Sequence, residues 1–235
     1  MKRRSIGTRH EMIVQPAFII GTYNEDGTHD FAPITWVSKT CEHDFDNLII
    51  ISMFGTKRTK QNVQRTKQLS INLVSTDMLG LMDYFGQTSG WDGVKDELPY
   101  TYSKGAYVEA PTLDLSPWVC ECEVSETVTT GQSDTFFCRV KNVQVDERID
   151  VDTKGIDLTL FDPVIYSGNY HSIGKFLGEI GDFYSKQKGD CLYGKTKIKS
   201  GSGSNFERAF RERHDYSIGD YRRRKTLCKK CECLL

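Results

Sequence analysis

Apolar positions occur in short runs that are separated by turn residues. An apolar run at residues 17–23 meets the turn signal 24–28, and residues 30–38 form a second run, which together predict a β-hairpin. Pro33 indicates that the returning strand is an edge strand or contains a bulge, because proline cannot donate to a sheet ladder. A further buried strand is expected at residues 48–53.

Two longer segments alternate between apolar and polar positions. In residues 118–130 the side chains of Cys120, Cys122 and Val124 share one face. Glu121 and Glu123 share the other, polar face, which is typical of a half-buried strand. Residues 135–145 alternate too, but their parity changes at residues 141–142, which predicts a β-bulge there.

Short helices are expected between the strands, at residues 57–67 and at residues 76–85 with Thr76 as the N-cap. Strands that follow one another directly, with only a few short helices, favour a mostly β fold. We therefore expect an antiparallel barrel or sandwich and not a parallel α/β sheet.

The most informative segment is 47–76, which contains no acidic residue in a chain with 31 basic and 32 acidic residues. A buried strand leads through Gly55 and Thr56 into the basic start of a helix at Lys57. Backbone N–H groups, hydroxyls and cations at a helix start favour an anion, so the pattern predicts a phosphate site. The alternative is an exposed basic helix between two strands, because charge runs are usually solvated.

Length and charge divide the chain of 235 residues into a body and a tail. Residues 186–235 carry 14 basic and 6 acidic side chains and include the Gly/Ser-rich stretch 195–204. We expect a folded domain at 1–188 and a flexible, poorly ordered basic tail at 189–235.

The chain shows no secretion signal and no apolar run long enough to span a membrane. Its eight cysteines are then expected to be reduced thiols, and a cytoplasmic location with no membrane partner is expected. Cys228, Cys231 and Cys233 could bind zinc, but a single C-x-x-C is a weak signal, and we expect no metal. The run 222–225 lacks an aromatic platform, so no nucleic-acid partner is expected.

The motifs of residues 12–185, taken in order, resemble the flavin reductase-like family of FMN-binding split barrels, and most of all its flavoredoxin branch. Asp30 and Phe31 depart from the family pattern, which commonly has an asparagine there. The segments that carry the resemblance are Gly21–Asn24, Asp26-Gly27, Phe31–Val37, Ser52–Asn62, Ser89-Gly90 with Lys95, Ala110-Pro111 and Ile165–Gly174.

The resemblance implies a six-stranded antiparallel Greek-key split β-barrel that forms a homodimer with FMN in a groove at the interface. It implies that the phosphate is held near the helix start, that the ribityl chain or ring edge lies at the end of the preceding strand, and that the ring lies beside the second hairpin strand. The implied FMN-binding residues are Thr35, Trp36, Val37, Ser52, Met53, Lys57, Arg58, Thr59, Asn62 and Tyr170.

His171 is the one catalytic candidate that the resemblance suggests, with a role near a nicotinamide. A lone histidine is otherwise more often structural, and an ordinary core or interface position is the alternative for Trp36. No other general acid or nucleophile is expected, because flavins carry the electron chemistry themselves.

Two functions remain open from the sequence. The first is an oxidoreductase that transfers electrons from NAD(P)H through FMN to a flavin or another acceptor. The second is a flavoredoxin-like carrier that holds FMN tightly, does not use NAD(P)H, and exchanges electrons with a redox-protein partner. The chain lacks a G-x-G-x-x-G after a strand, so NAD(P)H would bind only transiently over the flavin.

Overall fold

The computed structural model describes residues 3–5, 7–8, 14–41, 48–93, 98–150 and 157–178. The chain divides into one unit at Met1–Lys175 and another at Phe176–Leu235, and of the latter only 176–178 are described. The fold described below is that of the first unit. Lys95 and the predicted tail at 189–235, with its cysteines and its basic run, lie outside the described residues.

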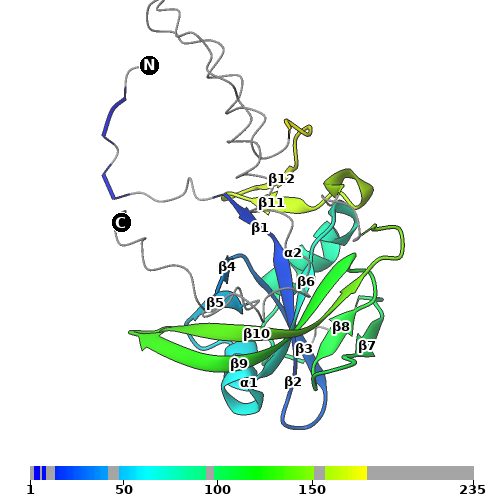
Figure 1. Cartoon of the computed structure of the whole chain (residues 1–235). Helices are drawn as coiled ribbons and strands as arrows, with labels where there is room; N and C mark the ends of the chain where they lie inside the picture. Colours follow the sequence, from blue (N-terminus) through cyan, green and yellow to red (C-terminus); the bar gives the residue numbers. More distant parts are fainter. Residues whose placement is uncertain are drawn as a thin grey trace, which may run out of the picture. The chain divides into compact units, whose positions relative to one another are not determined.

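One antiparallel sheet of seven strands forms the body of this unit, in the order β3-β2-β6-β9-β10-β5-β4 (Figure 1). The long β9–β10 hairpin crosses the view, and α1 lies below it. The strands are β2 (Phe18–Tyr23), β3 (His29–Ile34), β4 (Val37–Thr40), β5 (Leu48–Phe54), β6 (Gln68–Leu73), β9 (Trp118–Thr130) and β10 (Ser133–Val145).

The two edges of this sheet belong to one continuous piece of chain. β3 and β4 stand at opposite ends of the strand order, yet only Thr35 and Trp36 separate them in sequence. Counted as one bent strand, they give six strands that close on themselves, which is the arrangement of a split barrel. The expected six-stranded antiparallel barrel is confirmed, and Pro33 lies on an edge strand as predicted.

Two hydrophobic clusters fill the unit. The first lies inside the barrel and includes the fully buried Ile51, Met53 and Phe136 from β5 and β10. The second contains Phe31 of β3 and Phe85 of the helix α2, whose rings stack 5.7 Å apart. Each side chain of this size stabilises the fold by about 1.5–3 kcal/mol when buried.

Two helices lie at the ends of the strands. The helix α1 (Arg58–Thr66) follows β5 as predicted, and α2 (Leu79–Gln87) continues the 3₁₀ helix η1 (Thr76–Met78). The predicted N-cap at Thr76 is wrong, because Ser75 holds that position with extended backbone angles. The predicted bulge is confirmed by a register shift between Val140 and Asn142.

Short strands complete the unit. The pair β7 (Tyr102–Lys104) and β8 (Pro111–Leu113) forms one small sheet, and β1 (Gln15–Pro16), β11 (Val164–Tyr166) and β12 (Tyr170–Ser172) form another. A short 3₁₀ helix, η2 (Leu158–Leu160), precedes β11. Among the described residues, no helix is long and apolar enough to cross a membrane.

Candidate functional site

The start of α1 is the basic helix start at which the sequence predicted a phosphate site. Strand β5 ends at Phe54, and Gly55 turns the chain with a φ of 76°, which a glycine adopts without strain. Lys57 is the N-cap, makes no side-chain cap bond, and is followed by a first turn that has no acidic residue. The free N–H groups at the start of α1 form the positive end of the helix dipole. No carboxylate of the first turn neutralises this partial charge.

A cleft of about 570 Å³, the inner cleft, opens in front of this helix start. Three parts of the chain form it: the β5–α1 connection, the loop that follows α2, and the middle of β3. Its lining residues are Ala32, Pro33, Phe54, Thr56, Lys57, Arg58, Thr59, Phe85, Gly86, Gln87, Thr88, Ser89, Gly90 and Trp91.

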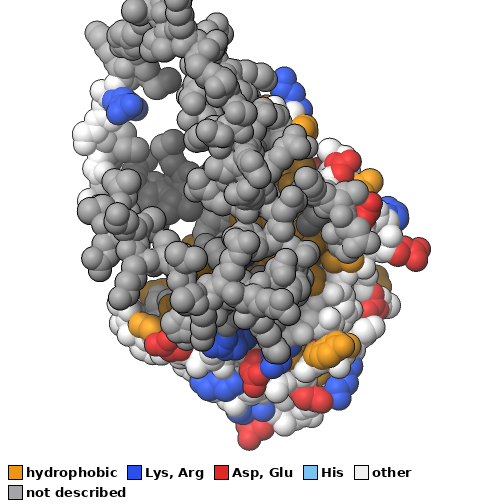
Figure 2. Space-filling model, in the orientation of Figure 1, with side chains coloured by type: hydrophobic (Ala, Val, Ile, Leu, Met, Phe, Trp, Pro, Cys, Tyr) orange, Lys and Arg blue, Asp and Glu red, His pale blue; other side chains and the backbone are white. Residues whose placement is uncertain are grey.

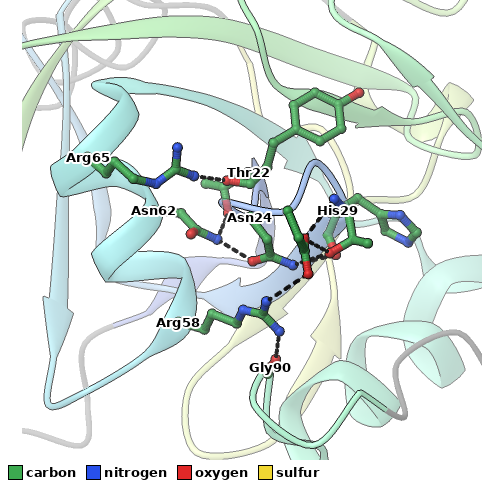
Figure 3. Close-up of polar contacts among 10 residues, drawn as sticks. Thr22, Asn24, His29, Arg58, Asn62, Arg65 and Gly90 are labelled. Atoms are coloured by element: carbon green, nitrogen blue, oxygen red, sulfur yellow. Dashed lines mark hydrogen bonds and ion pairs between the residues drawn. The ribbon is translucent and has the colours of Figure 1, made fainter.

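Arg58 of α1 contacts both the loop after α2 and the β2–β3 turn at the inner cleft. Its Nη1 donates to the carbonyl oxygen of Gly90 at 2.7 Å, and its Nη2 lies 3.7 Å from Oδ2 of Asp26 (Figure 3). Its guanidinium carbon lies 5.5 Å from the ring centroid of Trp91, a cation–π distance. A guanidinium has five N–H donors, more than these contacts use, so Arg58 can also bind an anion.

Gly90 makes this closure sterically feasible. A Cβ on Gly90 would fall 2.6 Å from Oδ1 of Asp30 and 3.0 Å from Cβ of Arg58, closer than side-chain atoms pack. The loop after α2 can therefore reach α1 and β3 only with glycine at this position.

Thr59 and Asn62 face the β2–β3 hairpin. The hydroxyl of Thr59 donates to Oδ2 of the buried Asp30. Nδ2 of Asn62 donates to Oγ1 of Thr22 at 3.1 Å and to Oδ1 of Asn24 at 2.8 Å (Figure 3). Both α1 side chains are buried, so these bonds fix the helix start against the hairpin.

The other residues expected at the strand end have different surroundings. Oγ of Ser52 lies 2.8 Å from Oγ1 of Thr135, and Met53 is fully buried in the barrel core. At the bend between β3 and β4, N–H of Val37 donates to the carbonyl of Thr35, while the carbonyl of Trp36 accepts from Ser52 at 2.9 Å. The Trp36 side chain is 49% exposed.

Tyr170 and His171 lie on β12, and neither lines the inner cleft. The Tyr170 hydroxyl donates to Oδ1 of Asp83 at 2.6 Å. Burial, together with this bond to a carboxylate, raises the pKa of Tyr170 to about 12. His171 is exposed.

The structure thus brings three of the expected binding residues into the inner cleft, namely Lys57, Arg58 and Thr59. Sequence reasoning missed Trp91 as a site residue, although it lines the inner cleft and its Nε1 donates to the carbonyl of Thr56 at 3.4 Å. The available signal was position, since Trp91 directly follows the expected Ser89-Gly90 pair.

Basic side chains mark this part of the surface. Lys and Arg gather in Figure 2 over the region where Figure 1 places α1, with acidic side chains beside them. Lys60 is a basic residue of α1 whose Nζ lies 3.4 Å from Oδ2 of Asp134 and donates to the carbonyl of Gln132 at 3.0 Å. The positive potential at the helix start is therefore partly balanced on the side of Lys60.

Comparison with known proteins gives matches along most of the chain. Residues 9–174 match the family model described as "Flavin reductase like domain". A search of curated protein sequences found no match.

Three solved structures show the same fold. Flavoredoxin of Desulfovibrio vulgaris (Miyazaki F) has a TM-score of 0.70 and 24% identity, covering 77% of this chain and 98% of that one. A flavin reductase with a split-barrel domain from Shewanella frigidimarina has a TM-score of 0.64 and 19% identity, covering 71% of this chain and 85% of that one. An FMN-binding protein from Thermus thermophilus has a TM-score of 0.61 and 18% identity, covering 76% and 97%.

Proposed function

The chain belongs to the flavin reductase-like family, and on this basis we propose that it is an FMN-binding oxidoreductase that accepts electrons from NAD(P)H. The proposal depends on one observation: a helix start without acidic residues in its first turn, together with Lys57 and Arg58, lines a cleft of about 570 Å³. This volume lies within the range of small-molecule and cofactor sites.

The donor set at the helix start fits a phosphate group. Thr56, the two cations Lys57 and Arg58, and Thr59 of the first turn of α1 all line the inner cleft. They supply a hydroxyl, positive charge and backbone N–H groups that an anion can use. Charge-assisted hydrogen bonds of this kind are short and strong, and the helix dipole adds to them. Lys57 and Arg58 are proposed to bind the phosphate, while Thr59 and Asn62 hold the helix start in place through their buried bonds.

The remaining walls of the inner cleft suit a flat aromatic ring. Ala32 and Pro33 of β3, with Phe54 and Phe85, supply apolar surface beside the phosphate corner. From Pro33 the chain runs on to the bend at 35–36, where we propose that backbone groups of Thr35, Trp36 and Val37 meet the ring edge, with Ser52 and Met53 at the neighbouring end of β5. FMN supplies the electron chemistry when bound, and the protein supplies its position and local field.

A homodimer is proposed because large apolar side chains stay exposed around the inner cleft. Phe54 and Trp91 line it and are each 54% exposed, and Trp36 is 49% exposed. Exposed aromatic side chains that cluster are typical of interfaces. A second copy would cover them and complete the flavin groove, and it could bring β12 with Tyr170 and His171 toward the ring.

A carrier without NAD(P)H use is the second candidate, and the similarity to a flavoredoxin favours it. It would pass electrons to a redox-protein partner. For either function we propose a cytoplasmic location, because Cys41, Cys120, Cys122 and Cys138, the cysteines that the structure describes, are free thiols.

Anaerobic stopped-flow mixing tests the proposal. The protein loaded with FMN is mixed with excess NADH or NADPH, and absorbance near the flavin band is followed. We expect rapid bleaching with at least one nucleotide. Absence of bleaching, together with full reduction by a protein donor, would contradict the reductase function and support the carrier function. Failure to bind FMN at all would contradict both functions.

A further inference from the structure

A buried carboxylate, Asp30 of β3, lies directly behind the wall of the inner cleft. The residue is 2% exposed and does not itself line the cleft. Two of its neighbours do line it: Oδ2 accepts a hydrogen bond from the hydroxyl of Thr59, and a Cβ added to Gly90 would fall 2.6 Å from Oδ1. A negative group thus lies behind both α1 and the loop after α2, at the corner proposed above for the flavin phosphate.

The bond to Asp30 determines what the Thr59 side chain can offer to a ligand. A hydroxyl group has one proton to donate and two lone pairs that accept. Because the proton of Thr59 is donated to Asp30, only lone pairs remain for a group in the inner cleft. Lone pairs repel the oxygens of a phosphate, so the Thr59 hydroxyl cannot donate to a phosphate while Asp30 holds its proton.

The charge of Asp30 also acts on the phosphate corner. Two negative groups repel each other, and the repulsion is much less screened inside a protein than in water. The carboxylate of Asp26, which lies 3.7 Å from Arg58, is exposed and therefore screened by solvent, whereas Asp30 is covered by protein. Asp30 therefore opposes the attraction that Lys57 and Arg58 exert on an anion in the inner cleft.

We propose that Asp30 sets the preference of this site for FMN over riboflavin: it weakens the hold on the terminal phosphate, so that the site also accepts flavin without a phosphate. The inference rests on the proposed FMN site. Asp30 is a positioning residue of that site, because it acts through Thr59 and through its charge and does not touch the ligand. A flavin whose phosphate is held less tightly dissociates more readily, which suits exchange with free flavin.

Asp30→Asn tests the inference, because it keeps the size of the side chain and removes its charge. The new amide can also donate to the Thr59 oxygen, which frees the hydroxyl proton for the inner cleft. Fluorescence titrations give the dissociation constants of FMN and riboflavin for each protein. We expect the preference for FMN, the ratio of the riboflavin constant to the FMN constant, to rise about tenfold in Asp30→Asn. A loss of stability that weakens both flavins equally leaves this ratio unchanged.

A second variant and a matched control complete the flavin titrations. Asp30→Ser removes the same charge with a smaller side chain, and it should raise the preference for FMN as well, so the test does not depend on the folding of one variant. Asp134→Asn is the control, because Asp134 is also buried and faces α1, where it accepts from Gln64 and pairs with Lys60. None of these three residues lines the inner cleft, and the ratio should stay within about twofold of the wild type.

Inorganic phosphate provides a probe that does not depend on flavin. Thermal unfolding at rising phosphate concentration, with chloride keeping the ionic strength constant, gives an apparent dissociation constant, which we expect to be about tenfold lower in both Asp30 variants than in the wild type. A preference for FMN that is unchanged or reduced in both variants would overturn the inference and leave the FMN site intact. Failure of the wild type to bind FMN would instead contradict the proposed function, and the phosphate titration would still decide whether Asp30 opposes an anion at this corner.

Discussion

Glu121 is a fully buried carboxylate on β9 whose two oxygens accept four hydrogen bonds. Oε2 accepts from the backbone N–H groups of Tyr107 and Val108 at 2.6 and 3.1 Å, and Oε1 accepts from Asn142 and Gln144 at 2.7 Å each. Burial alone would raise the pKa of Glu121, but these four donors lower it below the ordinary 4.5.

The linkage between this pKa and stability has a definite sign. Because the pKa of Glu121 is lower in the folded than in the unfolded state, its charged form stabilises the fold above the unfolded value. That contribution is lost as the pH falls through the folded pKa.

We expect Glu121→Gln to lower the free energy of unfolding by about 1–3 kcal/mol at pH 7, because the neutral amide loses the charge of the carboxylate and its nitrogen cannot accept a hydrogen bond from any of the four donors. The difference from the wild type should shrink as the pH falls below 4.5. Urea unfolding at several pH values measures it. Glu123→Gln is the control, since Glu123 lies two residues away and makes a surface pair with Lys141. Equal stability of the two variants would contradict the role given to Glu121.

The alternating pattern of β9 could not reveal this role. It places Glu121 on the same polar face as Glu123, and that is where the strand puts it. The N–H groups of Tyr107 and Val108 bond to Glu121, and this long-range contact leaves no local signal in the strand.

At the scale of helices and strands, local sequence patterns were sufficient to predict the elements that have clear turn residues, charge runs or alternation. The β2–β3 hairpin, the helix at 57–67 and the bulge at 141–142 follow from turn residues, charge and alternation. The strands β7 and β8 were not predicted, since each has only three residues, which is too few for an alternating pattern to be recognised. The roles of Thr59 and Asn62 were equally hidden, because the partners of these side chains lie about 30–40 residues away along the chain.

The contact between α1, β3 and the loop after α2 leads to a separate prediction about FMN affinity. Gly90→Ala places a Cβ within 2.6 Å of Oδ1 of Asp30, so the loop must move away from α1 and weaken its bond to Arg58. We expect FMN affinity to fall about tenfold, as for the loss of a charge-assisted bond. Fluorescence titration measures it.

Gly80→Ala is the matched control for this substitution. A Cβ on Gly80 meets nothing within 4 Å, and alanine is the better helix former by about 0.8–1.0 kcal/mol. This variant should keep its flavin affinity and unfold at a slightly higher temperature. If Gly90→Ala bound FMN as tightly as Gly80→Ala does, the loop would have no part in closing the cleft.

For the whole molecule, the order of motifs was more informative than any single one. Barrel closure through Thr35 and Trp36 joins strands that no local pattern connects, yet the family resemblance implied it and the strand order confirms it. The inner cleft needed the structure, because its walls come from three separate parts of the chain. The homodimer stays a prediction, and it is supported by the exposed aromatic side chains beside the cleft.

The dissociation constants of FMN and riboflavin, measured side by side, test whether the α1 corner holds a phosphate. Riboflavin lacks that group, so Lys57→Ala should weaken FMN binding about 10- to 100-fold, from a loss of about 1.5–3 kcal/mol, and change riboflavin binding less than twofold. Arg58→Gln should weaken FMN binding by at least as much and riboflavin binding by less, because its loss also loosens the loop. Lys57 matters here because it is exposed and lies at the helix N-cap, whereas Arg58 also holds the loop. Arg148→Gln should alter neither constant, because this exposed arginine pairs with Asp146 and does not line the inner cleft. Equal weakening of both ligands, or none in either variant, would place the phosphate elsewhere and contradict the proposed site.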